Sequence, residues 1–195
     1  MFVMNRLLLS TTLFFACLIG SFTVSADAAN PEVLIKTNHG EITVELDRVN
    51  APITVDNFLK YVDSNHYDGT LFHRVMTTFM IQGGGFDEDF NQKPTNDPIK
   101  NEANNGLSNE RGTLAMARTN DPHSATSQFF INVVNNDFLD FKAPSGSGWG
   151  YAVFGKVTHG MDIVDKIRQV DVGNFQGHAN VPTEPVVIET IRLSE

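Results

Sequence analysis

Apolar and polar residues alternate in short runs along most of this chain, and turn residues separate the runs at intervals typical of β-strands. Eight runs have the composition of strands: residues 33–37, 41–46, 71–76, 79–82, 113–118, 128–134, 151–157 and 186–193. The first two flank the three-residue turn Asn38-His39-Gly40, so we expect them to form a hairpin.

Two further segments show the helical period. The first begins at Pro52, a residue favoured at the start of a helix because its missing N–H needs no partner there. Its apolar stripe, at positions i, i+3, i+4 and i+7, consists of Val55, Phe58, Leu59 and Val62. The second segment runs from Gly160 to Val170, and its apolar face consists of Ile163, Val164, Ile167 and Val170.

Many strands with two interspersed helices predict a mainly β fold, a closed antiparallel barrel of eight strands capped by two α-helices. Side chains fill the interior of such a barrel, so we expect the functional groups on an outer face. Two long stretches, 86–111 and 142–150, are predicted to be loops. Long ordered loops on a rigid scaffold are often functional.

The first 28 residues have the layout of a secretory signal peptide. Arg6 is followed by an apolar run from Leu7 to about Val24, and small residues end in Ala26-Asp27-Ala28. An uncleaved membrane anchor is the alternative, which we disfavour because the run is short for a membrane span and contains polar residues. We therefore expect cleavage after Ala28 and a single domain over residues 29–195.

Composition narrows the choice of partner. Asp and Glu number 23 against 14 Lys and Arg, which gives a net charge of −9, and no cluster of basic residues occurs. A nucleic acid or an anionic membrane surface is therefore a poor partner, and a neutral or polypeptide partner is expected. The only cysteine, Cys17, lies in the predicted signal peptide, and Phe14-Phe15-Ala16 before it match a lipoprotein signal poorly.

Several chemistries lack the residues that they need. Gly83-Gly84-Gly85 is not followed by a Lys-Ser/Thr pair, so a phosphate-binding loop is disfavoured. The six histidines are scattered without ligand spacing, and we predict no metal. No G-x-S-x-G motif occurs, and Ser124 and Ser127 have no partner that sequence can assign, which leaves hydrolysis a weak alternative.

The segment FHRVMTTFMIQGGGF, residues 72–86, places Arg74 among apolar residues. A charge in such surroundings needs a reason, since its burial is costly. In residues 127–132, alternation would put Gln128 and Phe130 on one face of a strand and Phe129 on the other. We therefore expect an apolar pocket with one guanidinium at its edge, although each aromatic residue taken alone would also suit a core.

Three segments together resemble the cyclophilins, the cyclosporin-binding class of peptidyl-prolyl cis/trans isomerases. They are residues 72–86, GTLAMARTNDPHSATSQFFINV at 112–133 and YAVFGKVTHGMDIVDKI at 151–167. The resemblance covers essentially the whole chain after the signal. With the signal and the segment NVPTEPVVI at 180–188, the chain is most similar to periplasmic cyclophilins of Gram-negative bacteria.

The resemblance implies roles for eleven residues. The catalytic arginine of the family falls on Arg74, which is expected to stabilise the twisted amide with the help of Gln82. The positions that hold the proline ring fall on Phe79, Met80, Phe130 and Leu139. The positions that contact the substrate chain fall on Gln82, Ala117, Arg118 and Gln128.

The remaining two of the eleven positions depart from the eukaryotic pattern. Phe138 stands where eukaryotic cyclophilins have a tryptophan, and Tyr151 where they have a histidine. The missing indole N–H implies weak cyclosporin binding at most. Arg118 stands where many relatives have asparagine, and a cation there is expected to favour acidic residues flanking the proline.

The resemblance also implies how the protein works in the cell. We expect a monomer without cofactor that acts on proline-containing polypeptides and assists the folding of exported proteins in the periplasm. No membrane contact is expected after signal removal. The alternative is a proline-recognising chaperone or adaptor module whose isomerase activity is incidental.

Overall fold

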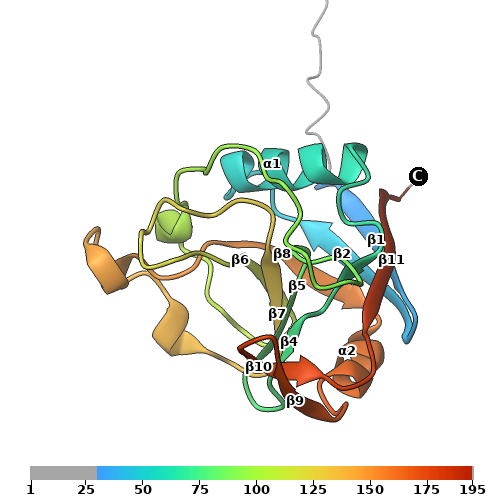
Figure 1. The fold of residues 1–195 in the computed structure, drawn as a ribbon. Helices are drawn as coiled ribbons and strands as arrows, with labels where there is room; N and C mark the ends of the chain where they lie inside the picture. The colour runs from blue at the N-terminus through green and yellow to red at the C-terminus, as the bar shows by residue number, and fades with distance from the viewer. Residues whose placement is uncertain (1–29, 195) are drawn as a thin grey trace, which may run out of the picture.

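The computed structural model describes residues 30–194, and the predicted signal peptide lies outside them. One antiparallel sheet of nine strands curls around the core, and two α-helices cover it (Figure 1). Its strands are β1 (Glu32–Thr37), β2 (Gly40–Leu46), β3 (Thr70–Leu71), β4 (Arg74–Val75), β5 (Met80–Gly83), β6 (Thr113–Met116), β7 (Phe129–Asn132), β8 (Val153–His159) and β11 (Val187–Leu193). The helices are α1 (Pro52–Asp63) and α2 (Met161–Ile167), and three short 3₁₀ helices are η1 (Ala103–Asn105), η2 (Asp137–Leu139) and η3 (Gly146–Trp149).

The two ends of the sheet meet, which curls it into a barrel. The strand order is β3-β11-β1-β2-β8-β6-β7-β5-β4, so the consecutive strands β3 and β4 lie at opposite ends of it. Only Phe72 and His73 separate these two strands, and the Gly84 N–H beyond β5 donates a hydrogen bond to the Leu71 carbonyl of β3 at 3.3 Å. The mainly β fold with two helices is confirmed, and the sheet has nine strands instead of eight because the predicted run 71–76 divides into two.

The inward-facing side chains of the sheet and the stripes of both helices form the main core. In β1 every second residue is buried, as the alternation predicts, and Val33 and Ile35 are fully inaccessible to solvent. The predicted stripe of α1 is also buried. Its Phe58 lies edge-on to Phe129 of β7, with ring centroids 5.5 Å apart, which joins the helix to the sheet.

A second sheet of two strands, β9 (Val172–Phe175) and β10 (His178–Pro182), is absent from the sequence prediction. Most of its residues are exposed, so it lacks the run of apolar residues by which the strands of the large sheet were predicted. Its turn consists of Gln176 at a φ of 48° and Gly177 at a φ of 84°, and only the glycine is a residue typical of such a turn. Phe175 packs edge-on against Phe90, which attaches the hairpin to the rest of the molecule.

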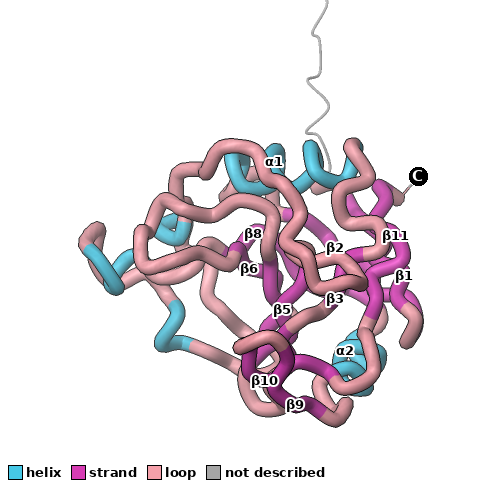
Figure 2. The backbone as a smooth tube through the Cα atoms, in the orientation of Figure 1, coloured by secondary structure: helices cyan, strands magenta, loops and turns pink. Residues whose placement is uncertain are grey.

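Loops and 3₁₀ helices gather on the side of the molecule away from β1 and β11 (Figure 2). They include much of the predicted loops 86–111 and 142–150. The second helix is shorter than predicted, since α2 ends at Ile167 and the predicted segment continues to Val170. Between residues 30 and 194, no helix is long and apolar enough to cross a membrane.

Candidate active site

Strand register aligns five side chains in one row across the outer face of the sheet. From β4 to β8, the paired residues are Arg74, Gln82, Phe130, Ala115 and Val153. Residues directly opposite each other in neighbouring strands project to the same face. Register therefore places a cation, an amide and an apolar surface side by side.

Alternation along each strand separates this outer surface from the main core. Ile81 and Phe129 point inward and belong to the main core. Their neighbours Met80 and Phe130 belong to a second apolar cluster together with Leu139. The prediction that the two adjacent phenylalanines serve different faces is confirmed.

A cavity of about 310 Å³ opens over the second cluster. It is lined by Arg74, Phe79, Met80, Gln82, Ala117, Arg118, Phe130, Phe138, Leu139 and Tyr151. These are ten of the eleven residues to which the resemblance assigned roles. The eleventh, Gln128, lines an adjoining hollow and accepts a hydrogen bond from the Gln82 amide at 2.9 Å.

Arg74 is half-buried at the edge of the cavity. Its Nη1 donates to Gln82 Oε1 at 3.3 Å, and its Nη2 lies 3.2 Å from the sulfur of Met76, a residue without a predicted role. Its guanidinium carbon is 6.0 Å from the ring centroid of Phe79. No described carboxylate forms an ion pair with Arg74. The full positive charge is therefore available to a ligand.

Phe138 forms the outer rim of the cavity. Its side chain is 64% exposed and stacks on Phe79 at a centroid distance of 5.6 Å. The backbone of Phe79 is held from beneath, since the Asn136 amide donates to its carbonyl at 2.9 Å. Asn136 therefore fixes the backbone that carries Phe79, and the Phe138 ring packs against the Phe79 ring.

Three buried asparagines, Asn109, Asn132 and Asn136, hold the backbone around Phe79 and Phe138, and no sequence pattern predicted this role. Asn136 also donates to Asn132 Oδ1 at 2.7 Å, and Asn132 donates to Thr113 Oγ1 at 2.9 Å and to Asn109 Oδ1 at 3.2 Å. Buried amides need partners, so the network holds the turn before η2 against β7. The signal in the sequence was an asparagine at the end of an apolar strand run, followed by more of them at 135 and 136.

Arg118 and Tyr151 meet at another part of the cavity. The guanidinium carbon of Arg118 lies 4.5 Å from the ring centroid of Tyr151. Arg118 Nε donates to the Gly150 carbonyl and Nη1 to the Thr119 carbonyl, each at 2.8 Å. The cation is therefore fixed by two hydrogen bonds and a cation–π contact.

His73, beside Arg74 in the chain, is buried behind the site. It is 5% exposed, and its pKa is lowered from 6.5 to about 4. The main cause is burial, since the charged form loses its hydration; the nearby charges of His178 and Arg74 also lower the pKa, and a hydrogen bond with the backbone of Leu71 opposes them. It stays neutral at pH 7. Over the described residues, no group of three or more His, Cys, Asp or Glu side chains is arranged to hold a metal.

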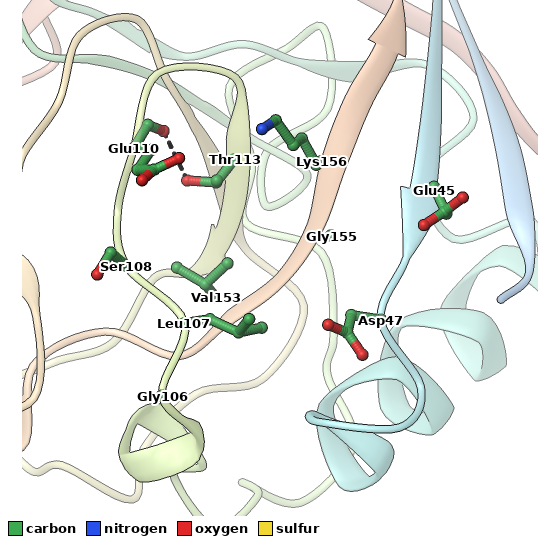
Figure 3. A pocket seen from close by; sticks show the side chains of 10 residues that line it. All are labelled: Glu45, Asp47, Gly106, Leu107, Ser108, Glu110, Thr113, Val153, Gly155 and Lys156. Atoms are coloured by element: carbon green, nitrogen blue, oxygen red, sulfur yellow. Dashed lines mark hydrogen bonds between the residues drawn. The ribbon is translucent and has the colours of Figure 1, made fainter.

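A second hollow, of about 390 Å³, lies between the end of β2, β8 and the loop before β6 (Figure 3). Figure 3 shows Glu45 and Asp47 on one side and Glu110 on the other. Lys156 also lines it. No predicted site residue falls here. Glu45 and Glu110 are exposed and Asp47 is half-buried, so these acidic side chains belong to a solvated surface.

Comparison with known proteins identifies the family. The model described as cyclophilin type peptidyl-prolyl cis-trans isomerase matches residues 32–193. The chain is 58% identical to peptidyl-prolyl cis-trans isomerase cyp18 of Streptomyces antibioticus, over 83% of this chain and 97% of that protein. It is also 58% identical to peptidyl-prolyl cis-trans isomerase B of Escherichia coli, over 84% of this chain and 99% of that protein.

A solved structure shares the fold. It is a crystal structure of a cyclophilin type peptidyl-prolyl cis-trans isomerase of Cryptosporidium parvum in the presence of the dipeptide Ala-Pro, with a TM-score of 0.68 and 25% sequence identity. The match covers 84% of this chain and 99% of that one. The family predicted from the three sequence segments is thus confirmed, and the chain belongs to the cyclophilin-type peptidyl-prolyl cis-trans isomerases.

Proposed function

We propose that this isomerase acts on exported proteins in the periplasm and that Arg74 stabilises the twisted amide. The observation that supports the role of Arg74 is its place at the edge of an apolar cavity, with no ion pair to any carboxylate among residues 30–194. Gln82 contacts the guanidinium and is itself held by Gln128. This chain of amides keeps the arginine in one position.

The reaction needs charge in the right place and no covalent chemistry. Rotation about a peptide bond has a barrier of about 18–20 kcal/mol, because the nitrogen lone pair is shared with the carbonyl. In the twisted amide the prolyl nitrogen regains a localised lone pair. A guanidinium that stays charged at every relevant pH can donate a hydrogen bond to it.

The apolar lining would hold the proline ring. Met80, Phe130 and Leu139 are buried and form the floor of the cavity, and Phe79 stands at its rim. The Cryptosporidium parvum structure in the presence of Ala-Pro supports the use of an X–Pro unit as the ligand here. The backbone at Ala117 and Arg118 would hold the substrate chain so that one side of the bond rotates.

The energetics require more than one contact. An acceleration of about 10⁵-fold corresponds to a barrier lower by about 7 kcal/mol. One hydrogen bond from a charged donor contributes about 1.5–3 kcal/mol. Exclusion of water by the apolar floor and fixation of the substrate backbone would supply the rest.

The test is the cis-to-trans rate of a short X–Pro reporter peptide. The chain from Ala29 onward and its Arg74→Ala variant are compared, with circular dichroism to show that both are folded. Wild-type acceleration that collapses in the variant supports the proposal. Equal acceleration by both proteins refutes the role of Arg74, and peptide binding without acceleration by either favours the adaptor alternative.

The export proposal needs a separate test. The full chain is expressed in a Gram-negative cell, the periplasmic and cytoplasmic fractions are separated, and the N-terminus of the protein is determined by mass spectrometry. We expect a periplasmic protein that begins at Ala29. A cytoplasmic protein that keeps residues 1–28 would contradict it.

A further inference from the structure

The arginines of this chain divide into two groups by their partners. Six lie in the part of the chain that the structure describes. Four of them form ion pairs with carboxylates: Arg48, Arg111, Arg168 and Arg192. The other two, Arg74 and Arg118, form none within residues 30–194, and both line the same cavity.

This division is unexpected for an acidic protein. With 23 acidic and 14 basic residues, the chain offers carboxylates in excess. No Asp or Glu lines the cavity, and none lines the adjoining hollow of about 170 Å³. Asp121 lies in the nearby loop, and its carboxylate accepts a hydrogen bond from the backbone N–H of His123. The cavity and the hollow beside it thus form a locally cationic surface.

Arg118 lines both the cavity and the adjoining hollow. The adjoining hollow shares Gln82, Ala117 and Arg118 with the cavity. A peptide whose proline occupies the cavity and whose chain continues over these residues therefore passes the Arg118 guanidinium. The two hydrogen bonds of that group use Nε and Nη1, and Nη2 has no protein partner within the described residues.

We propose that Arg118 selects substrates with an acidic side chain within two residues of the proline. The inference rests on the proposed function of the cavity and adds a substrate class to it. Arg74 acts on the prolyl nitrogen, whereas Arg118 contributes to binding. The preference therefore affects KM more than kcat.

The experiment compares reporter peptides that differ in one residue. Glu, Ala or Lys is placed at each of the two positions before the proline and at the position after it, and kcat and KM are measured. For wild type, kcat/KM with Glu should exceed that with Lys by about two- to fivefold at one position at least, the range of a partly exposed ion pair. In 1 M salt, where the screening length is about 3 Å, the ratio should fall towards one.

Variants assign the preference to one residue. Arg118→Gln should bring the Glu/Lys ratio close to one, and Arg118→Lys should restore part of it. Arg48 pairs with Asp56 and lines neither the cavity nor the adjoining hollow. The control variant Arg48→Gln should therefore keep the wild-type Glu/Lys ratio.

Two outcomes overturn the proposal. One is an Arg118→Gln protein with the wild-type ratio; the other is a wild-type ratio that salt does not change, which decides the matter even if the variant fails to fold. Failure of the isomerase function itself would be seen separately, as no acceleration of the Ala peptides by wild type.

Discussion

Two hollows on this molecule differ more in charge than in size. The hollow between β2 and β8 measures about 390 Å³ and is lined by three carboxylates and one lysine. The cavity over β5 and β7 measures about 310 Å³ and is lined by two arginines and no carboxylate. The larger space is therefore not the one that suits the reaction, and the aligned row of Arg74, Gln82 and Phe130 distinguishes the smaller one.

Reversing the charge at the Arg74 edge of the cavity should have the largest effect. Arg74→Glu places a negative charge at this edge, like the charge of the other hollow. The variant loses the hydrogen-bond donor, and its carboxylate repels the lone pair of the twisted amide. We expect kcat/KM on an X–Pro reporter to fall by about 10³-fold, equal to about 4 kcal/mol. Lys156→Glu, a matched reversal in the acidic hollow, should leave kcat/KM unchanged, and an equal loss in both variants would break the comparison.

The buried histidine behind the cavity should make stability depend on pH. The pKa of His73 is about 4 in the folded protein and about 6.5 in the unfolded chain, so the unfolded state binds more protons between these values. Stability is therefore lost as the pH falls from about 6.5 to about 4, by about 3 kcal/mol from this group. The measurement is the free energy of unfolding in urea at pH 7 and pH 4.

A His73→Gln variant isolates this contribution. It removes the titrating group, so its stability should fall less than that of wild type over the same range. Parallel pH curves for the two proteins would show that His73 does not carry the effect.

A change in the asparagine network should affect stability and substrate binding without removing a group that takes part in the reaction. Asn136→Ala leaves the Oδ1 of Asn132 without a buried donor and leaves the carbonyl of Phe79 with the Val133 N–H alone, at a cost of about 1–3 kcal/mol in the free energy of unfolding. Because the carbonyl of Phe79 loses one of its two donors and its ring is held less firmly, KM should rise as well. Asn104→Ala, at an exposed site in η1, should change neither quantity. Equal stability of the two variants in urea would refute the supporting role.

The smallest effect is expected from a substitution at the rim of the cavity, and it concerns cyclosporin affinity. The resemblance places Phe138 at the position of a tryptophan in eukaryotic cyclophilins, so Phe138→Trp would introduce that indole N–H beside the cavity. One neutral hydrogen bond is worth about 0.5–1.5 kcal/mol, so cyclosporin should bind about three- to tenfold more tightly than to wild type. Isothermal titration of both proteins gives the comparison. Tight binding by wild type would contradict the predicted role of the missing indole.

Alternation along the strands made much of the fold and the arrangement of the cavity predictable. Phe129 and Phe130 could be assigned to opposite faces because adjacent residues of a strand project to opposite sides. The order of the strands did not follow from alternation, since pairing between distant segments leaves no periodic pattern. The β9–β10 hairpin was missed because most of its residues are exposed.

Two parts of the site could be identified only from the structure. Asn109 lies 23 residues before Asn132, so the hydrogen bond that joins Asn109 to Asn132 and Asn136 depends on how β7 and the loop before β6 meet. Arg118 was placed in the site by resemblance, but its hydrogen bonds to Gly150 and Thr119 and its contact with Tyr151 depend on loop geometry. Side-chain networks between loops have no short sequence signature.

The most direct test of the role of Arg74 separates rotation from binding. NMR exchange measurements on an X–Pro peptide give the isomerisation rate of the bound peptide and its dissociation constant in one experiment. In Arg74→Ala we predict a bound-state rate about 100-fold lower than in wild type, with a dissociation constant changed about threefold at most. A bound-state rate equal to that of wild type would show that the arginine does not stabilise the twisted amide.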